Sequence, residues 1–267
     1  MTTVTMTTTA AAPDAPEVTS SELLAVVASR ALVGRRTVFA GIGLPTLAAS
    51  LAHLTVAPGL EIVYESGVCG AHPSHLPETI ADAVLITGAE AVLTIPALFG
   101  YVLQGGHIDV GFLGAAQIDK WGNLNSSVIG DWHSPGVRLP GSGGAMEVMA
   151  NAREVFVVMR RHTPRSFTEE LDFCTSSGPD RALADGVRPL GAGVTRVITD
   201  LGVLERRGVG DELRLVAVHP GVTVDQVREA TGWDLKVAED VTVVAPPSDS
   251  ELRLLRKDVD PDRVYLR

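Results

Sequence analysis

Apolar residues along the chain follow two spacings that alternate. Near the N-terminus, a helical spacing behind a capping Ser20 or Ser21 predicts a first helix. Its apolar positions are Leu23, Leu24, Val27 and Leu32. The run Val38–Ala40 then predicts a short buried strand. A second helix is expected over Thr46–Leu54, with Pro45 in the first turn, where proline is accepted.

The same alternation continues towards the C-terminus. Short apolar runs predict further strands at Leu60–Tyr64, Ala83–Ile86, Val110–Gly114, Val155–Met159, Val194–Thr199 and Leu213–Val218. Helices are predicted at Ala97–Gln104, Ala145–Ala152 and Val224–Thr231, the last with a capping box of Thr223 and Gln226. The polar stretch His162–Asp185 is expected to cross the surface or to face a partner. Together these elements predict an α/β fold, a mostly parallel sheet covered by helices on both faces.

The length and composition fit one globular unit. The chain has 267 residues, enough for a large α/β domain, and no internal repeat or long linker divides it. We expect residues 19–267 to form a single domain. Residues 1–18 are rich in Thr, Ala and Pro and contain no Lys or Arg, so we expect a disordered tail rather than a signal peptide or anchor. No run approaches the roughly 18 apolar residues that a membrane span needs.

Charge and cysteine usage exclude several classes of partner. The formal net charge of −10 argues against a nucleic acid or an anionic membrane surface, since both are bound through Lys and Arg. An anionic small molecule is still possible, because helix N-termini or a second subunit can hold a phosphate. Cys69 and Cys174 form no CxxC pattern, so neither a disulfide framework nor a zinc site is expected, and a cytoplasmic location is favoured. Pro73 separates His72 from His75, so a metal site is not expected.

Glu65 directly follows the predicted strand 60–64 and is followed by Gly67 and Gly70. In open parallel sheets, ligands bind where loops leave the carboxyl ends of the strands. Glycines there let the backbone approach a ligand closely. An exposed surface glutamate is the common alternative at such a position. Cys69 lies nearby, but no neighbouring pattern supplies a base for it, and buried inert cysteines are more frequent than nucleophilic ones.

Two glycine-rich turns could line the same pocket. Gly41-Ile42-Gly43 begins like a dinucleotide-binding fingerprint, but Thr46 stands where the third glycine belongs, so a tight turn lining a pocket fits as well. Gly141–Gly144 precedes the helix predicted from Ala145, and several N–H groups there could converge on an oxyanion. A flexible glycine turn is equally compatible with this second segment.

Taken in order, five segments resemble the class I CoA transferases, specifically the β subunits of the glutaconate CoA-transferase and 3-oxoacid CoA-transferase group. The segments are FAGIGLPT at Phe39–Thr46, YESGVCG at Tyr64–Gly70, GGHIDVGFLGAAQIDKWGNLN at Gly105–Asn125, PGSGGAMEV at Pro140–Val148, and Pro220–Thr223 followed by Thr231-Gly232. Each segment alone is weak evidence, whereas five in the family order are specific.

The resemblance implies the fold that CoA transferases share with sugar isomerases, and the β subunit of a heteromeric acyl-CoA:carboxylate CoA-transferase. In that family a glutamate attacks acyl-CoA and carries CoA as a glutamyl thioester, so the implied nucleophile is Glu65. The amides of Gly143 and Gly144 would stabilise the oxyanion. Further pocket groups implied by the resemblance are Gly41, Gly43, Gln117 and Asn123. Coenzyme A would be a substrate, with no permanently bound cofactor.

The implied partner is a CoA-transferase α subunit, in a heterodimer or an α2β2 tetramer, and the chain alone is expected to be inactive. The 3-oxoacid branch has Ser-Glu-Asn-Gly where this chain has Tyr64–Gly67, so the glutaconate-like branch fits better. Relatives of the family also hydrolyse acyl-CoA, cleave rings or decarboxylate, and these reactions stay open as alternatives. A non-catalytic domain that binds a small molecule is a further one.

Overall fold

The computed structural model describes residues 18–73 and 75–266, so the predicted tail 1–18 lies outside the described residues apart from Val18. The strands of the main sheet are β1 Thr37–Ala40, β2 Glu61–Val63, β3 Val68–Cys69, β4 Ala91–Val92, β5 Val110–Leu113, β10 Glu154–Met159, β11 Val194–Thr199, β12 Gly202–Glu205, β13 Arg214–Val218 and β14 Lys236–Val243. Two small hairpins are formed by β6 Gln117–Ile118 with β7 Leu124–Asn125, and by β8 Val128–Gly130 with β9 Pro135–Arg138.

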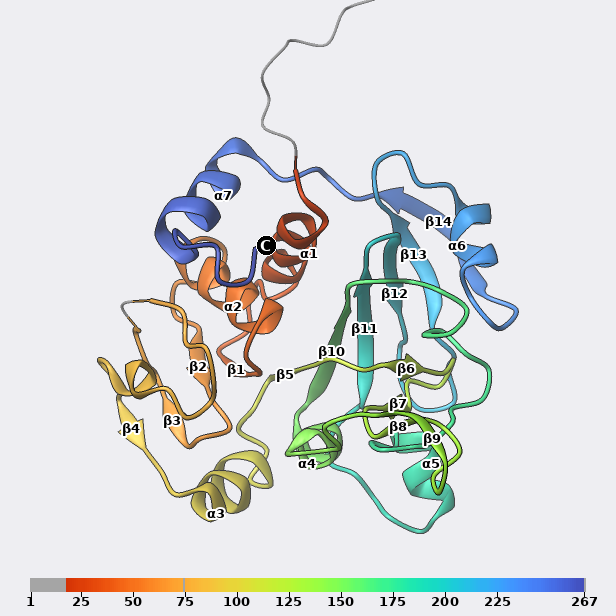
Figure 1. The fold of residues 1–267 in the computed structure, drawn as a ribbon, viewed down its shortest axis with the longest axis horizontal. Coiled ribbons are helices and arrows are strands. Elements are labelled where there is room, and N and C mark those ends of the chain that lie inside the picture. The colour runs from red at the N-terminus through yellow and green to blue at the C-terminus, as the bar shows by residue number, and fades with distance from the viewer. Residues whose placement is uncertain (1–17, 74, 267) are drawn as a thin grey trace, which may run out of the picture.

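The helices surround this sheet (Figure 1). The α-helices are α1 Ser20–Arg30, α2 Leu44–Leu54, α3 Ile95–Ala97, α4 Ala145–Asn151, α5 Pro179–Ala184, α6 Val224–Glu229 and α7 Asp249–Leu254. One 3-10 helix, η1 Ala83–Ile86, and two π-helical turns, η2 Leu98–Leu103 and η3 Leu255–Val259, complete the described elements.

The centre of the sheet is parallel, as predicted. The strand order is β14-β13-β12-β11-β10-β5-β1-β2-β3-β4. Neighbours run parallel from β2 through β1, β5 and β10 to β11. Antiparallel pairs extend the sheet at both sides, with β3 and β4 beyond β2 and with β12 and β13 beyond β11, while β14 runs parallel to β13. The carboxyl ends of β1, β2 and β5 therefore meet at one edge.

Side chains alternate between two cores because successive residues of a strand point to opposite faces. Along β10, Phe156 and Val158 enter the core shared with α1, α2 and η3, whereas Val155 and Val157 enter the core shared with η2, α4 and α6. Figure 1 shows α1, α2 and α7 grouped on one side of the molecule. Helices thus pack on both faces, which confirms the predicted α/β layering.

Most predicted elements are present, with small shifts at their ends. The strands predicted at 38–40, 60–64, 110–114, 155–159, 194–199 and 213–218 correspond to β1, β2, β5, β10, β11 and β13. The second helix begins at Leu44 with Pro45 in its first turn, and α6 has the predicted capping box, in which the Thr223 hydroxyl accepts from the Gln226 N–H.

The strand predicted at Ala83–Ile86 is wrong, since this segment is the 3-10 helix η1. The Asp82 carboxylate accepts a hydrogen bond from the Val84 N–H at 3.0 Å and starts the turn. Val84 and Leu85 are both buried although they are adjacent, which a two-sided strand with one exposed face does not allow.

Three further predictions need smaller corrections. Thr19, not a serine, caps α1, because its hydroxyl accepts from the Glu22 N–H while the Glu22 carboxylate accepts from the Thr19 N–H. The helix expected at 97–104 is built from α3 and the π-turn η2. The segment His162–Asp185 is not only a surface crossing, since Phe167 is fully buried and the Ser176 carbonyl accepts from the Leu124 N–H.

Candidate active site

Glu65 lies in the turn between β2 and β3. The Gly67 N–H donates to the Tyr64 carbonyl at 2.9 Å, and the Tyr64 N–H donates to the Val68 carbonyl at 2.9 Å. This is the pattern of a three-residue hairpin loop that ends in a glycine with positive φ. Gly67 has φ +101°, and a Cβ there would lie 2.0 Å from the Leu93 carbonyl oxygen. The turn therefore requires glycine and fixes the backbone that presents Glu65.

The structure brings Glu65 together with the glycines that precede α4. The Gly144 N–H donates to Glu65 Oε1 at 2.8 Å. Gly144 is the N-cap residue of α4, and N–H groups at a helix start have no partner within the helix. A Cβ on Gly144 would lie 2.6 Å from Phe99 Cζ, and one on Gly143 would lie 3.4 Å from Glu65 Oε1. The backbone of both glycines therefore borders the carboxylate.

Only one oxygen of the Glu65 carboxylate has a described donor. The side chain is half-buried, and Oε1 accepts from Gly144. Across residues 18–73 and 75–266, no hydrogen bond to Oε2 and no ion pair of Glu65 is found. An ionised carboxylate only accepts hydrogen bonds, so Oε2 keeps its lone pairs available for attack on an electrophile.

Gly41 and Gly43 lie at the same edge of the sheet, because β1 and β2 are parallel neighbours. The Thr46 hydroxyl donates to the Gly41 carbonyl at 2.9 Å, which closes the turn after β1. Gly43 caps α2 with φ +105°. A Cβ on either glycine would meet no atom within 4 Å. Both therefore border open space next to the Glu65 turn.

Gln117 and Asn123 are buried in a polar network of the β6–β7 hairpin. Gln117 accepts from the Asn125 amide at 2.7 Å and donates to the Asp172 carboxylate at 3.2 Å. Asn123 donates to Asp119 at 2.7 Å and accepts from a backbone N–H just before α5. The described bonds of both side chains thus lead to structural partners rather than to Glu65. A role for them in the pocket stays a prediction.

Two residues near the site carried no recognisable motif. Phe99 lies on the π-turn η2, faces Gly144 and makes an edge-to-face contact with Phe39, with ring centroids 6.2 Å apart. A π-turn changes which side chains face inward, and apolar spacing alone does not reveal it. Ser126, directly after the glycine-to-asparagine motif at 105–125, donates to the Gly141 carbonyl at 2.8 Å.

The titratable side chains next to Glu65 do not compete as nucleophiles. Burial raises the pKa of Tyr64 to about 12, so its hydroxyl is protonated at neutral pH. Burial, and after it the charge of Glu61, raises the pKa of the Cys69 thiol. Because the thiolate is the reactive form of cysteine, Cys69 is a poor nucleophile in this setting.

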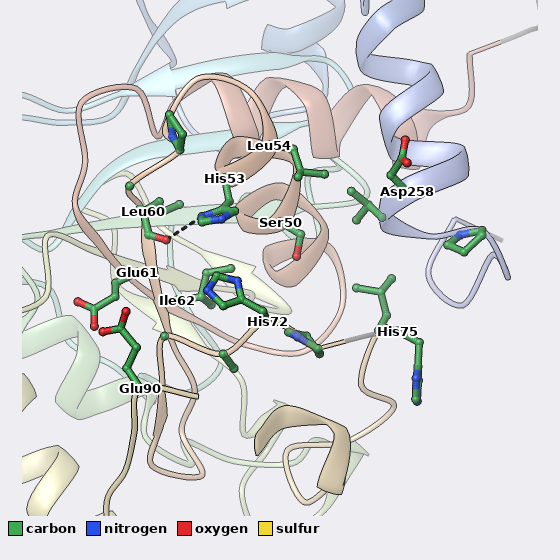
Figure 2. Close-up of a pocket in the computed structure, with 18 residues that line it drawn as sticks. Ser50, His53, Leu54, Leu60, Glu61, Ile62, His72, His75, Glu90 and Asp258 are labelled. Carbon is green, nitrogen blue, oxygen red and sulfur yellow. Dashed lines mark hydrogen bonds between the residues drawn. The ribbon is translucent and has the colours of Figure 1, made fainter. Parts of the chain in front are cut away.

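A separate cavity of about 550 Å³ lies between α2, β2, β3 and η3 (Figure 2). The rings of His53 and His72 lie 5.3 Å apart at its wall, and Glu61 and Glu90 face each other at its edge. Glu65 does not line this cavity. In the described part of the chain, no group of three or more His, Cys, Asp or Glu side chains could hold a metal ion. Nor does any helix there have the length and apolar character to cross a membrane.

Comparison with known proteins gives three close relatives. The chain is 44% identical over 240 residues to the β subunit of 3-oxoadipate CoA-transferase from Pseudomonas knackmussii, covering 89% of this chain and 92% of the relative. It is 31% identical over 247 residues to the cholesterol ring-cleaving hydrolase IpdB subunit of Rhodococcus jostii, covering 92% and 94%. The crystal structure of glutaconate coenzyme A-transferase from Acidaminococcus fermentans superimposes with a TM-score of 0.87 at 28% identity, covering 95% and 99%.

A family model agrees with these relatives. The model for coenzyme A transferases matches residues 22–230, which include the Glu65 turn, the glycines before α4 and the parallel centre of the sheet. The match therefore extends over most of the chain and over every segment that carried the resemblance from Phe39 to Thr223. The chain belongs to the coenzyme A transferase family.

Proposed function

We propose that this chain is the β subunit of a heteromeric acyl-CoA:carboxylate CoA-transferase and that Glu65 is its nucleophile. The observation that carries the proposal is the 2.8 Å hydrogen bond from the Gly144 N–H to Glu65 Oε1, which leaves Oε2 without a described partner. One oxygen is therefore oriented and the other is available. Family membership supplies coenzyme A as the substrate group.

The first half of the reaction loads CoA onto Glu65. Oε2 attacks the acyl carbonyl of the donor, CoA leaves as thiolate, and a mixed anhydride forms. The thiolate then attacks Glu65 Cδ, the donor carboxylate leaves with Oε2, and a glutamyl-CoA thioester remains. During this second attack the negative charge develops on Oε1, to which the Gly144 N–H already donates. Removal of one such oxyanion donor costs about 3 to 4 kcal/mol in other enzymes.

The second half reverses these steps with a new acid. The acceptor carboxylate attacks Cδ of the thioester and expels CoA thiolate, which forms a second anhydride. The thiolate then attacks the acceptor's carbonyl carbon and releases Glu65 as a carboxylate. One acceptor oxygen is thereby left on Glu65 in each turnover. No step requires proton transfer, which agrees with a site where the neighbouring Tyr64 and Cys69 are held protonated.

The partner and substrate class follow from the relatives. Two of them are CoA-transferases named for 3-oxoadipate and glutaconate, both dicarboxylates, so we propose a dicarboxylic acyl group and an α subunit that completes the CoA site, in a heterodimer or an α2β2 tetramer. Glu65 and the open turns at Gly41 and Gly43 would face that subunit. The two described cysteines are unpaired, which supports a cytoplasmic location.

The decisive experiment traps the thioester. The complex with its α subunit is incubated with an acyl-CoA and then with borohydride, and the peptide carrying Glu65 is examined by mass spectrometry for reduction of the side chain to an alcohol. Glu61→Gln is the matched control, because Glu61 is a glutamate of the same hairpin that borders the separate cavity instead. We expect Glu61→Gln to be loaded normally. An unmodified Glu65 in the wild-type complex would contradict the proposal.

Isotope transfer separates this reaction from hydrolysis or decarboxylation on the same fold. With an acceptor acid labelled by ¹⁸O in its carboxylate, we expect the label in Glu65 after one turnover and in the released donor acid after the next. A ring-cleaving hydrolase such as the Rhodococcus relative would instead take its oxygen from water. Label that appears in Glu65 only from ¹⁸O-water would favour hydrolysis.

A further inference from the structure

The turn that carries Gly144 is held by a side chain with no part in the reaction steps above. Ser126 Oγ donates to the Gly141 carbonyl at 2.8 Å, and the Gly141 N–H donates back to the Ser126 carbonyl at 2.9 Å. The two residues are 15 positions apart, with the β8–β9 hairpin between them. Gly141 has φ +97°, so the backbone turns sharply where Ser126 holds it.

Ser126 is itself fixed by its neighbours. Its N–H donates to Thr175 Oγ1 at 2.9 Å, and the same hydroxyl of Thr175 lies 2.7 Å from Ser127 Oγ. The preceding Asn125 is fully buried and donates to Gln117 at 2.7 Å. The Ser126 hydroxyl is therefore presented from a rigid support, and its bond to Gly141 transmits that rigidity to the turn.

The distance from this bond to the reacting carboxylate is short along the chain. The Ser142 carbonyl accepts from the Ala145 N–H at 2.8 Å, and this turn points the Gly144 N–H towards Glu65. Rotation of the peptide after Gly141 would swing the Gly144 N–H away from Oε1, because no side chain on these glycines resists it. A hydrogen bond weakens steeply as its angle closes, so a small rotation is enough.

We infer that Ser126 is a positioning residue for CoA transfer, whose hydroxyl holds the Gly141–Gly144 turn so that the Gly144 N–H points at Glu65 Oε1. The inference rests on the proposed function, since it assigns a purpose to the same amide. A purely structural role for Ser126 makes a different prediction: the fraction of folded or assembled protein falls, but each correctly assembled site works at the normal rate.

The experiment measures the rate per active site in the complex with the α subunit. Borohydride trapping of the glutamyl thioester counts the loaded sites, and kcat is divided by that count. For Ser126→Ala we expect kcat per loaded site to fall about tenfold while the KM for acyl-CoA changes less than about twofold, since a loosened donor costs less than the roughly 10²-fold loss on removing one. Ser126→Thr keeps an Oγ donor and is expected to recover most of the rate.

A matched serine serves as the control. Ser166 Oγ donates to the Arg161 carbonyl at 3.0 Å in a surface turn, so Ser166→Ala removes the same kind of bond without touching Gly141. Its kcat per loaded site should equal that of the wild type. If Ser126→Ala does not assemble, Ser126→Cys keeps the volume but donates more weakly, and an intermediate loss is expected.

Three results would overturn the inference. Wild-type kcat per loaded site in Ser126→Ala, or in Ser126→Cys if only that variant assembles, would contradict it while leaving the proposed function intact. An equal loss in Ser166→Ala would show that any such bond matters, and not this one. Absence of a trappable thioester in the wild-type complex would overturn the proposed function and this inference with it.

Discussion

Glu22 and Glu65 are both carboxylates held within the fold, yet their surroundings differ. The Glu22 side chain is 1% exposed, and Arg256 donates to both of its oxygens, from Nε at 2.5 Å and from Nη2 at 2.8 Å. The Thr19 N–H donates to it as well. Glu65 is half-buried, accepts from the Gly144 N–H alone among described donors, and has no described cation beside it.

The difference separates a structural carboxylate from a reactive one. Burial tends to raise the pKa of Glu22, but the hydrogen bonds and charge of Arg256 and the bonds from Thr19 outweigh it and hold that pKa below the ordinary value. Both oxygens are then engaged in holding α1 to the segment that follows α7. Glu65 keeps one oriented oxygen and one available oxygen, which is what a nucleophile requires. Four predictions test whether this contrast holds.

The largest effect is expected for Glu65→Gln. The amide keeps the size of the side chain but cannot form the anhydride, so transfer activity should fall by about 10⁴-fold or more, the scale seen when a catalytic nucleophile is removed. The free energy of unfolding should change by less than about 1 kcal/mol, because only one hydrogen bond is altered. Steady-state assays and thermal unfolding of the same preparations check both points. A variant with near wild-type transfer activity would contradict the assignment.

Glu22→Gln should show the reverse pattern. Removing the charge leaves the Arg256 guanidinium with a neutral partner, and loss of one member of a buried pair destabilises a protein by about 3 kcal/mol. The activity per folded molecule should stay the same. Denaturant unfolding measures the loss, and Glu170→Gln on the exposed surface is the control, with no expected change. Equal stability of the Glu22 and Glu170 variants would show that the pair with Arg256 contributes little.

Gly144→Ala tests the donor instead of the acceptor. The N–H is kept, but the added Cβ would lie 2.6 Å from Phe99 Cζ and 3.0 Å from Glu65 Oε1, so one of them must move. We expect kcat to fall by about 10²-fold, similar to the loss of an oxyanion donor. Adding Phe99→Ala makes room for the Cβ and should restore part of the rate. No recovery in the double variant would place the clash on Glu65 rather than on Phe99.

Much of the fold was predictable because periodicity reports burial directly. The strands β1, β5, β10 and β11 are apolar runs between polar turns, and their parallel arrangement follows from the intervening helices. Glu65 could be placed at a strand end from the glycines after it. Its identification as a nucleophile needed the ordered family motifs, since the local sequence fits a surface glutamate equally well.

The remainder depends on contacts between distant residues. Arg256 and Glu22 are 234 positions apart, and the bond of Ser126 to Gly141 depends on the intervening β8–β9 hairpin. No local pattern encodes either contact. The helix η1 was mistaken for a strand because one carboxylate, that of Asp82, redirects an apolar run. Such single hydrogen bonds outweigh weak local propensity.

A smaller and pH-dependent effect is expected for the second ion pair between α1 and α7. Arg30 donates to Glu251 from Nε at 2.8 Å and from Nη2 at 2.7 Å. Burial opposes the charge of Glu251, but the bonds from Arg30 and Ser248 lower its pKa from 4.5 to about 2. Because the folded pKa is depressed, the pair stabilises the fold at pH values above about 4.5.

This stabilisation should be lost as the pH falls from about 4.5 to about 2, when Glu251 takes up a proton in the folded state too. Unfolding free energies of the wild type and Glu251→Gln should therefore differ at neutral pH and converge over that interval. The Glu65→Gln variant provides the comparison, since the Glu65 carboxylate has no described cation partner and its replacement should give no such convergence. A constant difference between wild type and Glu251→Gln down to the lowest pH would show that Arg30 does not stabilise the charged form, and that the contrast between paired and unpaired carboxylates does not extend beyond Glu22.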